Sequence, residues 1–260
     1  MKLLFLGDII GEPGRIAVKA LLPGLKKELG LDFVVANGEN SAGGFGITAK
    51  VLDELLASGI DVVTSGNHIW DKKEVMQIID TETRLLRPAN YPEGVAGFGY
   101  RVYDTPGGLK IAVLNLEGRV YLSNIDCPFR TAKKAVNKIK EETNIIVVDF
   151  HAEITSEKNA LGNYLDGEIS ALFGTHTHIQ TADERILPGG TAYITDAGMC
   201  GATDSVIGIK KEMALQRFLY DIPVRFEVAT GSVKINGVFI EIDEQTGKAL
   251  SILRLSREHK

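Results

Sequence analysis

The chain has 260 residues, of which 44% are hydrophobic and 24% are charged, and its net charge is -5 at pH 7. This composition favours a folded α/β protein with a sizeable core and argues against a disordered or fibrous chain. The acidic balance argues against an extended nucleic-acid surface, but it is compatible with a small anionic substrate held by bound metal ions.

The first predicted element is a buried strand at residues 3–7, LLFLG. Asp8 ends this apolar run before it reaches the length of a signal-peptide core, and no stretch approaches the roughly 20 apolar residues that cross a bilayer. We therefore expect a cytoplasmic protein without a membrane anchor. Cys127 and Cys200 lie far apart and outside any Cys-x-x-Cys pair, so we expect reduced thiols and no disulfide framework.

Strand and helix patterns alternate in the first part of the chain. Buried strands are predicted at residues 33–37 and 61–66, and helices at residues 15–29 and 49–58. The first helix is expected to be offset at Pro23, and the second to begin behind a Thr48 cap. Such a βαβαβ alternation predicts a parallel sheet.

From about residue 98 onward the pattern becomes strand-rich, with few helices expected. Apolar runs at residues 110–116 and 144–150 predict buried strands. Alternating segments typical of antiparallel strands lie at residues 99–104, 192–198, 224–231, 233–243 and 248–255. We expect two facing mixed sheets flanked by helices, and a single domain over residues 1–260, because no repeat or long linker divides the chain.

Four of the five histidines directly follow a predicted strand. These are His68, His151, His176 and His178, whereas His259 lies in the charged C-terminal tail and is expected to be exposed. Sites in open α/β sheets form beyond the carboxyl ends of the strands. Because residues two apart in an extended segment point the same way, His176 and His178 are both expected to face one cavity.

Polar residues follow the strands of the first sheet in the same way. Asp8 follows the first strand, Glu39 and Asn40 follow the second, and Asn67 follows the third. Carboxylate, amide and imidazole groups without cysteine suit Mn, Fe or Zn, and seven of them suit two bridged ions better than one tetrahedral ion. We therefore predict a dinuclear catalytic metal site built from Asp8, Glu39, Asn40, Asn67, His151, His176 and His178.

Each of these residues also has a purely structural interpretation. Asp8 could cap a turn, and Glu39 with Asn40 could lie in a solvated loop. The joint pattern is more specific, because several independent accidents would have to fall at one sheet edge. Asp71 opens the acidic segment DKKE, where helix capping is the favoured role and orientation of His68 is the alternative.

At these positions the sequence resembles the calcineurin-like dinuclear metallophosphoesterases, whose pattern runs from an early Asp through a bridging acid, Asn-His and a lone His to a final His-x-His. It is more similar to the bacterial YmdB-type subfamily, through GDIIGEPGR, NGENSAGGFGIT, GNHIWD, RPANYP, DCPF, DFHAEITSEK and GTHTHIQTADERILPGGTAYITDAGM. Two departures from the wider superfamily are expected in this subfamily. Asp8-Ile9-Ile10 stands for Asp-x-His, and Glu39 stands for the bridging Asp.

The resemblance implies a four-layer αββα sandwich that hydrolyses phosphodiesters such as 2′,3′-cyclic nucleotides. It implies two divalent or mixed-valence ions, with Fe or Mn favoured over Zn. The first ion would take Asp8, Glu39, Asn40 and His178, and the second would take Glu39, Asn67, His151 and His176. His68 stays off the metals as the general acid, protonating the leaving oxygen while a metal-bridging hydroxide attacks the phosphorus.

Two other functions remain open at this point. The same metal core could serve a phosphomonoesterase or protein phosphatase, and the chain could be a regulatory protein that acts mainly through RNA-processing partners. The native metals, the physiological substrate and assembly into a homo-oligomer are left open by the sequence.

Overall fold

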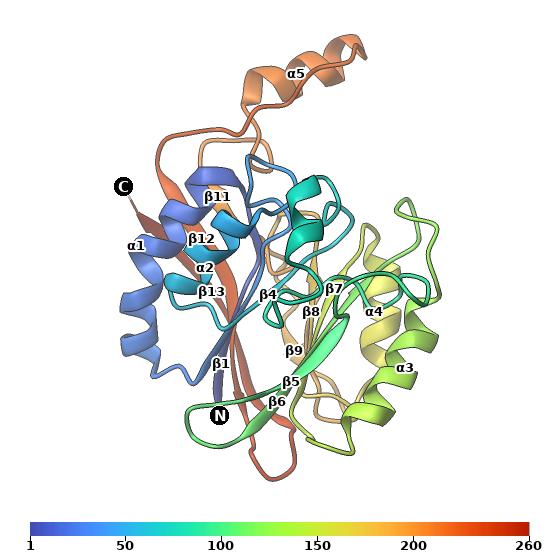
Figure 1. The fold of residues 1–260 in the computed structure, drawn as a ribbon. Helices are drawn as coiled ribbons and strands as arrows, with labels where there is room; N and C mark the ends of the chain where they lie inside the picture. Colours follow the sequence, from blue (N-terminus) through green and yellow to red (C-terminus); the bar gives the residue numbers. More distant parts are fainter. Residues whose placement is uncertain (260) are drawn as a thin grey trace.

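Short runs rich in Val, Ile, Leu and Phe form the centre of two β-sheets that lie face to face (Figure 1). The structure is a computed structural model, and it describes residues 1–259. The first sheet contains β1 (Lys2–Leu6), β2 (Asp8–Ile9), β3 (Phe33–Asn37), β4 (Val62–Thr64), β11 (Met199–Ala202), β12 (Val233–Ile242) and β13 (Ala249–His259). The second contains β5 (Tyr100–Asp104), β6 (Lys110–Glu117), β7 (Ile146–His151), β8 (Ala171–Thr175), β9 (Arg185–Ile186) and β10 (Ala192–Ile194).

Both sheets are mixed. The first has the order β2-β11-β12-β1-β3-β4, with β13 also paired to β12, and the second has the order β5-β6-β7-β8-β10-β9. β1, β3 and β4 are parallel, which confirms the predicted βαβαβ start, and β12 joins β1 in the antiparallel sense. β10 is antiparallel to β9 and parallel to β8, so the antiparallel pairing predicted for residues 192–198 holds on one side of the strand only. β10 is buried throughout, as is usual for a parallel strand with both faces covered.

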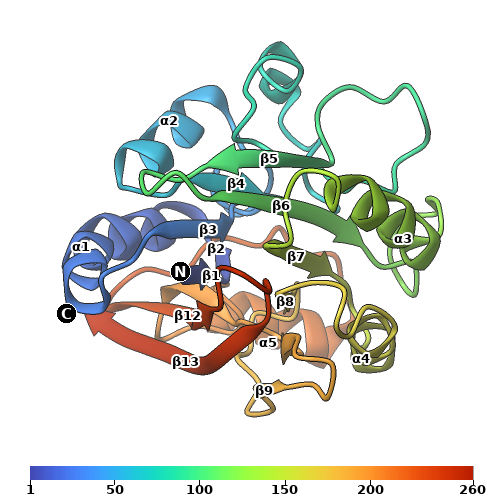
Figure 2. The same ribbon diagram turned by 90° about the horizontal axis from the view of Figure 1, so that it is seen from below.

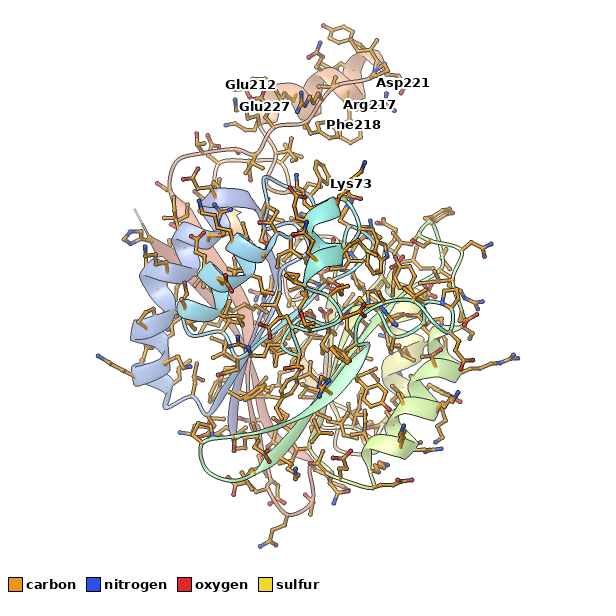
Figure 3. The ribbon with its side chains drawn as sticks, in the orientation of Figure 1. Lys73, Glu212, Arg217, Phe218, Asp221 and Glu227 are labelled. Carbon is orange, nitrogen blue, oxygen red and sulfur yellow. The ribbon has the colours of Figure 1, made fainter. Side chains whose placement is uncertain are left out.

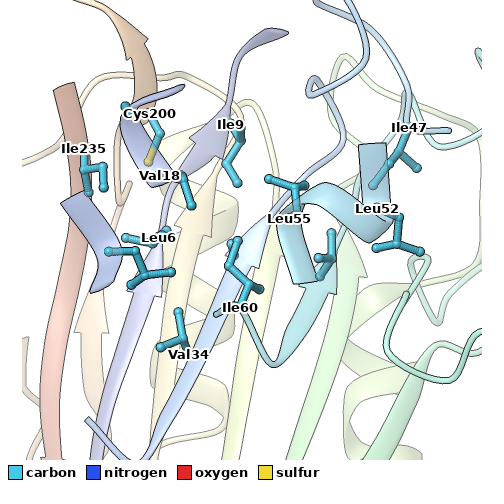
Figure 4. Packing of buried hydrophobic residues seen from close by; sticks show 14 of the residues in the cluster. Leu6, Ile9, Val18, Val34, Ile47, Leu52, Leu55, Ile60, Cys200 and Ile235 are labelled. Carbon is cyan, nitrogen blue, oxygen red and sulfur yellow. The ribbon is translucent and has the colours of Figure 1, made fainter. Parts of the chain in front are cut away.

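Helices cover the outer face of each sheet, as Figure 2 shows from below. The helices are α1 (Gly11–Leu29), α2 (Ala49–Ala57), the 3-10 helix η1 (Lys73–Gln77), α3 (Pro128–Ile139), α4 (Thr155–Tyr164) and α5 (Lys211–Tyr220), of which α5 stands apart from both sheets. Val18 of α1 and Leu52 and Leu55 of α2 belong to one apolar cluster with Leu6 and Val34 of the first sheet (Figure 4). α3 and α4 pack on the second sheet in the same way, and the predicted αββα sandwich is confirmed.

A separate apolar core fills the space between the two sheets. It contains Leu3 and Val35 from the first sheet and Val147 from the second. Phe5 of β1 stacks on Phe173 of β8 with their ring centroids 4.6 Å apart. This core aligns the two sheets, so strand ends from both of them meet at one end of the sandwich.

Several predicted elements differ from the structure. α1 runs without a break through Pro23. Pro23 has no N–H to donate to the Lys19 carbonyl, but both residues are exposed, so this carbonyl lies on the solvent side of the helix. The strand predicted at residues 224–231 is wrong: only Val228 forms a bridge, with Ile209, because no strand lies beside the rest of the segment. The expectation of few helices after residue 98 is also wrong, since α3, α4 and α5 all lie there.

Two smaller expectations concern the caps and the cysteines. Thr48 caps α2 as predicted, with its side chain accepting a hydrogen bond from the Val51 backbone N–H. Cys127 and Cys200 are both free, as expected. Across residues 1–259, no helix has the length and apolar character that crossing a membrane requires.

Candidate metal centre

The eight predicted site residues gather at the end of the sandwich where the strands finish. Asp8 begins β2, immediately beyond β1, and His151 is the last residue of β7. Glu39 and Asn40 follow β3, Asn67 and His68 follow β4, and His176 and His178 follow β8. Parallel strands bring their carboxyl ends to the same edge of a sheet, so residues far apart in the chain become neighbours here.

One group of donors lies around His151. The ligand atoms of Glu39, His151 and His176 all lie within 4.8 Å of one another. His151 Nε2 lies 2.9 Å from Glu39 Oε1, 2.9 Å from His176 Nδ1 and 3.0 Å from Asn67 Oδ1. Imidazole nitrogens together with carboxylate and amide oxygens are the donors that Mn, Fe and Zn accept, so this group is a candidate metal site.

A second group of donors lies around Asp8. His178 Nε2 lies 3.7 Å from Asp8 Oδ1, and the Asn40 side-chain nitrogen lies 3.3 Å from His178 Nε2 and 3.2 Å from Glu39 Oε1. Asp8 Oδ1 is buried and has no hydrogen-bond partner within residues 1–259. A buried carboxylate oxygen without a donor is costly, and a bound cation would remove that cost. Rotation of the Asn40 amide would present its oxygen to the same ion.

Burial and neighbouring charges shift the pKa values of these groups in opposite directions. Burial raises the pKa of Asp8, whereas for Glu39 the adjacent His151 outweighs burial and lowers the pKa to about 2. Burial opposes a charge on His151, but Glu39 and Asp8 raise its pKa to about 9. Burial and the nearby His151 lower the pKa of His176 to about 3. The carboxylates therefore favour a positive charge among them, which a metal ion can supply in place of the proton on His151.

The far nitrogens of the imidazole rings are held by hydrogen-bond partners. His151 Nδ1 lies 2.9 Å from Thr175 Oγ1, and this hydroxyl donates to the buried Asp149 at 2.7 Å. His178 Nδ1 donates to the Ile207 carbonyl at 2.9 Å. Each contact occupies Nδ1 and leaves Nε2 directed at the donor cluster, which is the usual way in which a protein orients a metal-binding histidine.

Asp149 is the centre of a buried polar network beneath the site. It accepts hydrogen bonds from Thr64 Oγ1 at 2.5 Å and from Asn37 Nδ2 at 2.9 Å, in addition to the one from Thr175. Burial raises its pKa to about 7. The residues belong to β3, β4, β7 and β8, so the network ties the ends of the two sheets together below the donors.

Gly66 allows two of the candidate ligands to approach each other. A Cβ atom at this position would lie 2.3 Å from His151 Cδ2 and 2.4 Å from Glu39 Oε2. Both distances are far shorter than a van der Waals contact. The glycine of the segment GNH is therefore required by packing at the site.

The segment from His176 to His178 is a bend, so the extended conformation predicted for it is wrong. The φ angles of His176 and His178 are 101° and 65°, which non-glycine residues rarely adopt. Asp196 holds the bend by accepting hydrogen bonds from the Thr177 backbone N–H at 3.0 Å and from its hydroxyl at 2.8 Å. Lys158 donates to the same carboxylate at 2.9 Å, and both members of this ion pair are fully buried.

His68 lies beside the donor cluster. Its backbone N–H donates to Glu39 Oε2 at 3.2 Å, and its Nδ1 lies 2.8 Å from Asp71 Oδ2. η1 begins at Lys73 without a side-chain cap, so the capping role favoured for Asp71 is wrong, and contact with His68 is what the structure shows. The short spacing between His68 and Asp71 places them on one turn of the chain.

A cavity of about 360 Å³ opens above the donor cluster. Glu39, His68, His176 and His178 line one part of it. The sequence reasoning missed several supporting residues, among them Asp149, Lys158 and Asp196. An acidic residue inside the apolar run NIIVVDF was a signal for Asp149, whereas a lysine on a helix carries no comparable signal.

The sequence is similar to those of known proteins. The sequence model of the YmdB-like protein family matches residues 4–255. The 2′,3′-cyclic-nucleotide 2′-phosphodiesterase of Bacillus subtilis strain 168 is 50% identical over 255 residues, which cover 98% of this chain and 96% of the relative. The similarity therefore extends over nearly the whole of both sequences.

Solved structures share the fold as well. The crystal structure of a hypothetical protein from Thermus thermophilus is 39% identical, has a TM-score of 0.93 and is matched over 100% of both chains. The crystal structure of a novel phosphatase from Mycoplasma pneumoniae is 37% identical with a TM-score of 0.93, and the match covers 99% of this chain and 93% of that one.

Proposed function

This chain belongs to the YmdB-like family, and on that basis we propose that it is a dinuclear metal-dependent phosphodiesterase that hydrolyses 2′,3′-cyclic nucleotides. The observation that carries the proposal is the meeting of Glu39, His151 and His176 beside the unpartnered Asp8 Oδ1. The activity of the Bacillus relative supports the substrate class.

The donor set fits two ions that share Glu39. Asp8, Glu39, Asn40 and His178 would hold the first ion, and Glu39, Asn67, His151 and His176 would hold the second. The mixture of nitrogen and oxygen donors favours Fe or Mn, with Zn as the alternative. Bound ions of this kind supply an activated water and neutralise charge on the phosphoryl oxygens.

We assign His68 the role of general acid. It borders the cavity without belonging to the donor groups, and its side chain is partly exposed. Asp71 accepts a hydrogen bond from Nδ1 and thereby directs Nε2 at the cavity, where a leaving oxygen would accept its proton. Asp71 acts on the reaction only by positioning this ring.

The variant His68→Ala tests the assignment. We expect kcat to fall about 100- to 10,000-fold on 2′,3′-cyclic AMP while the metal content stays at the wild-type level. An activated aryl diester should suffer less, because its leaving group needs no proton. Wild-type rates in the variant, or equal losses across leaving groups, would contradict the role of His68.

The product separates this function from its closest alternative. Opening of the 2′ bond yields 3′-AMP, which phosphorus NMR distinguishes from 2′-AMP. The Mycoplasma phosphatase structure supports a competing phosphomonoesterase function on the same metal core. Rates measured side by side on an aryl monoester, an aryl diester and 2′,3′-cyclic AMP decide between the two functions. A clear preference for the monoester would contradict the proposed phosphodiesterase function.

A further inference from the structure

The cavity above the donor cluster has an apolar side that the hydrolytic chemistry does not use. We call this side the apolar wall, and it consists of Phe45, Ile207, Ile209 and Phe226. Phe45 follows β3, whereas the other three residues flank α5. Phe45 and Phe226 are 37% and 38% exposed, although both border a cavity. Convergent apolar residues around a cavity are typical of a ligand site that a bound molecule covers.

Backbone hydrogen bonds hold the part of the apolar wall that flanks α5. Ile207, Ile209 and Phe226 flank α5 in an arm, residues 203–231, whose base joins α5 to the body of the molecule (Figure 1). At this base the Lys210 backbone N–H donates to the Glu227 carbonyl at 3.0 Å, and the Ala229 N–H donates to the Gly208 carbonyl at 2.9 Å. A preformed surface costs less conformational entropy on binding than one that must order.

The apolar wall also connects to the histidines of the site. Ile207 has a φ of 47°, which β-branched residues rarely adopt, and its carbonyl is the acceptor that holds His178. The Phe45 ring lies edge-on to the His68 ring, with their centroids 5.0 Å apart. A ligand on the wall is therefore next to both the general acid and the donor cluster.

We propose that the apolar wall binds the nucleobase of the substrate, with the base stacked on Phe45 and in contact with Phe226. This inference rests on the proposed cyclic-nucleotide activity. If His68 protonates the 2′ oxygen, the base must lie nearby, because it is attached to the ribose carbon next to C2′. Phe45 is the aromatic ring in contact with His68, so it is placed to meet that base.

The chemistry of the wall also predicts how strongly it distinguishes between bases. The four side chains carry no hydrogen-bonding group, and every nucleobase has a flat face that stacks on an aromatic ring. We therefore expect tolerance of all four bases, with purines favoured for their larger stacking area. A cavity of about 360 Å³ lies at the small end of the range for ligand sites, which fits a mononucleotide better than a longer chain.

The test compares kcat/KM for 2′,3′-cyclic AMP with kcat/KM for glycerol 1,2-cyclic phosphate, which has a five-membered cyclic diester and no base. Wild type should prefer the nucleotide. In Phe45→Ala and in Phe226→Ala we expect the ratio of the two values to fall about 5- to 150-fold. Phe45→Tyr should restore the ratio, because it keeps the ring.

Matched measurements separate the wall from the proposed function. Phe218→Ala removes an exposed phenylalanine that does not line the cavity, so it should leave the ratio unchanged. Phe45→Ala could lower activity by disturbing the adjacent His68 ring. Phe226→Ala tests the wall without touching that contact. A wild-type ratio in both variants, or a wild type without preference for the nucleotide, overturns the base-binding proposal. Failure of wild type to hydrolyse either diester overturns the proposed function instead.

Discussion

The donor cluster and the arm that carries α5 are neighbours in space, but they are held in opposite ways. Asp8, Glu39 and His151 are completely buried and are surrounded by polar contacts from both sheets. On α5 only Ala214 is buried, and Phe218 is 82% exposed on a helix that stands apart from the body (Figure 3). The site chemistry therefore depends on the fold, whereas α5 can vary at little cost to stability.

The largest effect should come from the shared carboxylate of the donor cluster. Glu39→Ala should lose bound metal and reduce kcat/KM at least about 10,000-fold, because each ion contributes several kcal/mol to charge stabilisation. Elemental analysis and steady-state kinetics measure the two effects. Glu74→Ala, which removes an exposed carboxylate on η1, should change neither. Full metal content in Glu39→Ala would remove Glu39 from the ligands.

The second prediction concerns the buried ion pair behind the bend. Lys158→Met leaves Asp196 charged and buried without its partner, so the free energy of unfolding should fall by about 3–5 kcal/mol. Urea denaturation monitored by circular dichroism gives this value. The double variant Lys158→Met/Asp196→Asn removes both charges and should recover a large part of the loss. If the single variant is as stable as wild type, the pair does not support the site.

A smaller effect is expected from the contact that orients His151. Thr175→Val keeps the shape of the side chain but removes the hydroxyl between His151 and Asp149. Metal affinity should fall about 10- to 100-fold, as for other partners of metal-binding histidines. Thr175→Ser retains the hydroxyl and should bind metal like wild type. Equal affinity in the Val variant, measured by competition with a chelator, would show that the hydroxyl is not needed.

The smallest effect should come from the arm. Phe218→Ser replaces a side chain that is 82% exposed, so the free energy of unfolding should change by no more than about 0.5 kcal/mol. Metal content should stay the same. Thermal denaturation checks the first expectation. A loss of stability as large as that of Lys158→Met would contradict the claim that the arm contributes less to stability than the site does.

The sequence predicted the part of the site that strand ends determine. An apolar run that ends at Asp8 or before Glu39 predicts both a buried strand and a polar group just beyond it. Parallel strands then bring such groups together at one edge of the sheet. The pairing of Lys158 with Asp196 was beyond this reasoning, because 38 positions separate the residues and only the tertiary fold brings them together. Local patterns carry no information about such contacts.

Other misses have local physical causes. α5 has only Ala214 buried, so its sequence shows no apolar face, whereas α3 does bury residues at helical spacing, Ala132, Ala135, Val136 and Ile139, and the sequence reading passed over this period. The bend at His176 depends on the hydrogen bonds that Asp196 provides, which override the extended preference of the segment. Phe226 lies in a segment read as a strand, because alternation alone does not show whether a pairing strand is present.

The alignment of the two sheets has a consequence for how remote substitutions would act. Donor atoms on β2 and just beyond β3 must stay in register with those on β7 and just beyond β8, and the Phe5–Phe173 stack lies in the layer that sets this register. A displacement of about 1 Å at a reacting centre can cost about 100-fold in rate. Volume changes deep between the sheets should therefore appear first as slow turnover by a protein that still melts cooperatively, so stability screens alone would miss them.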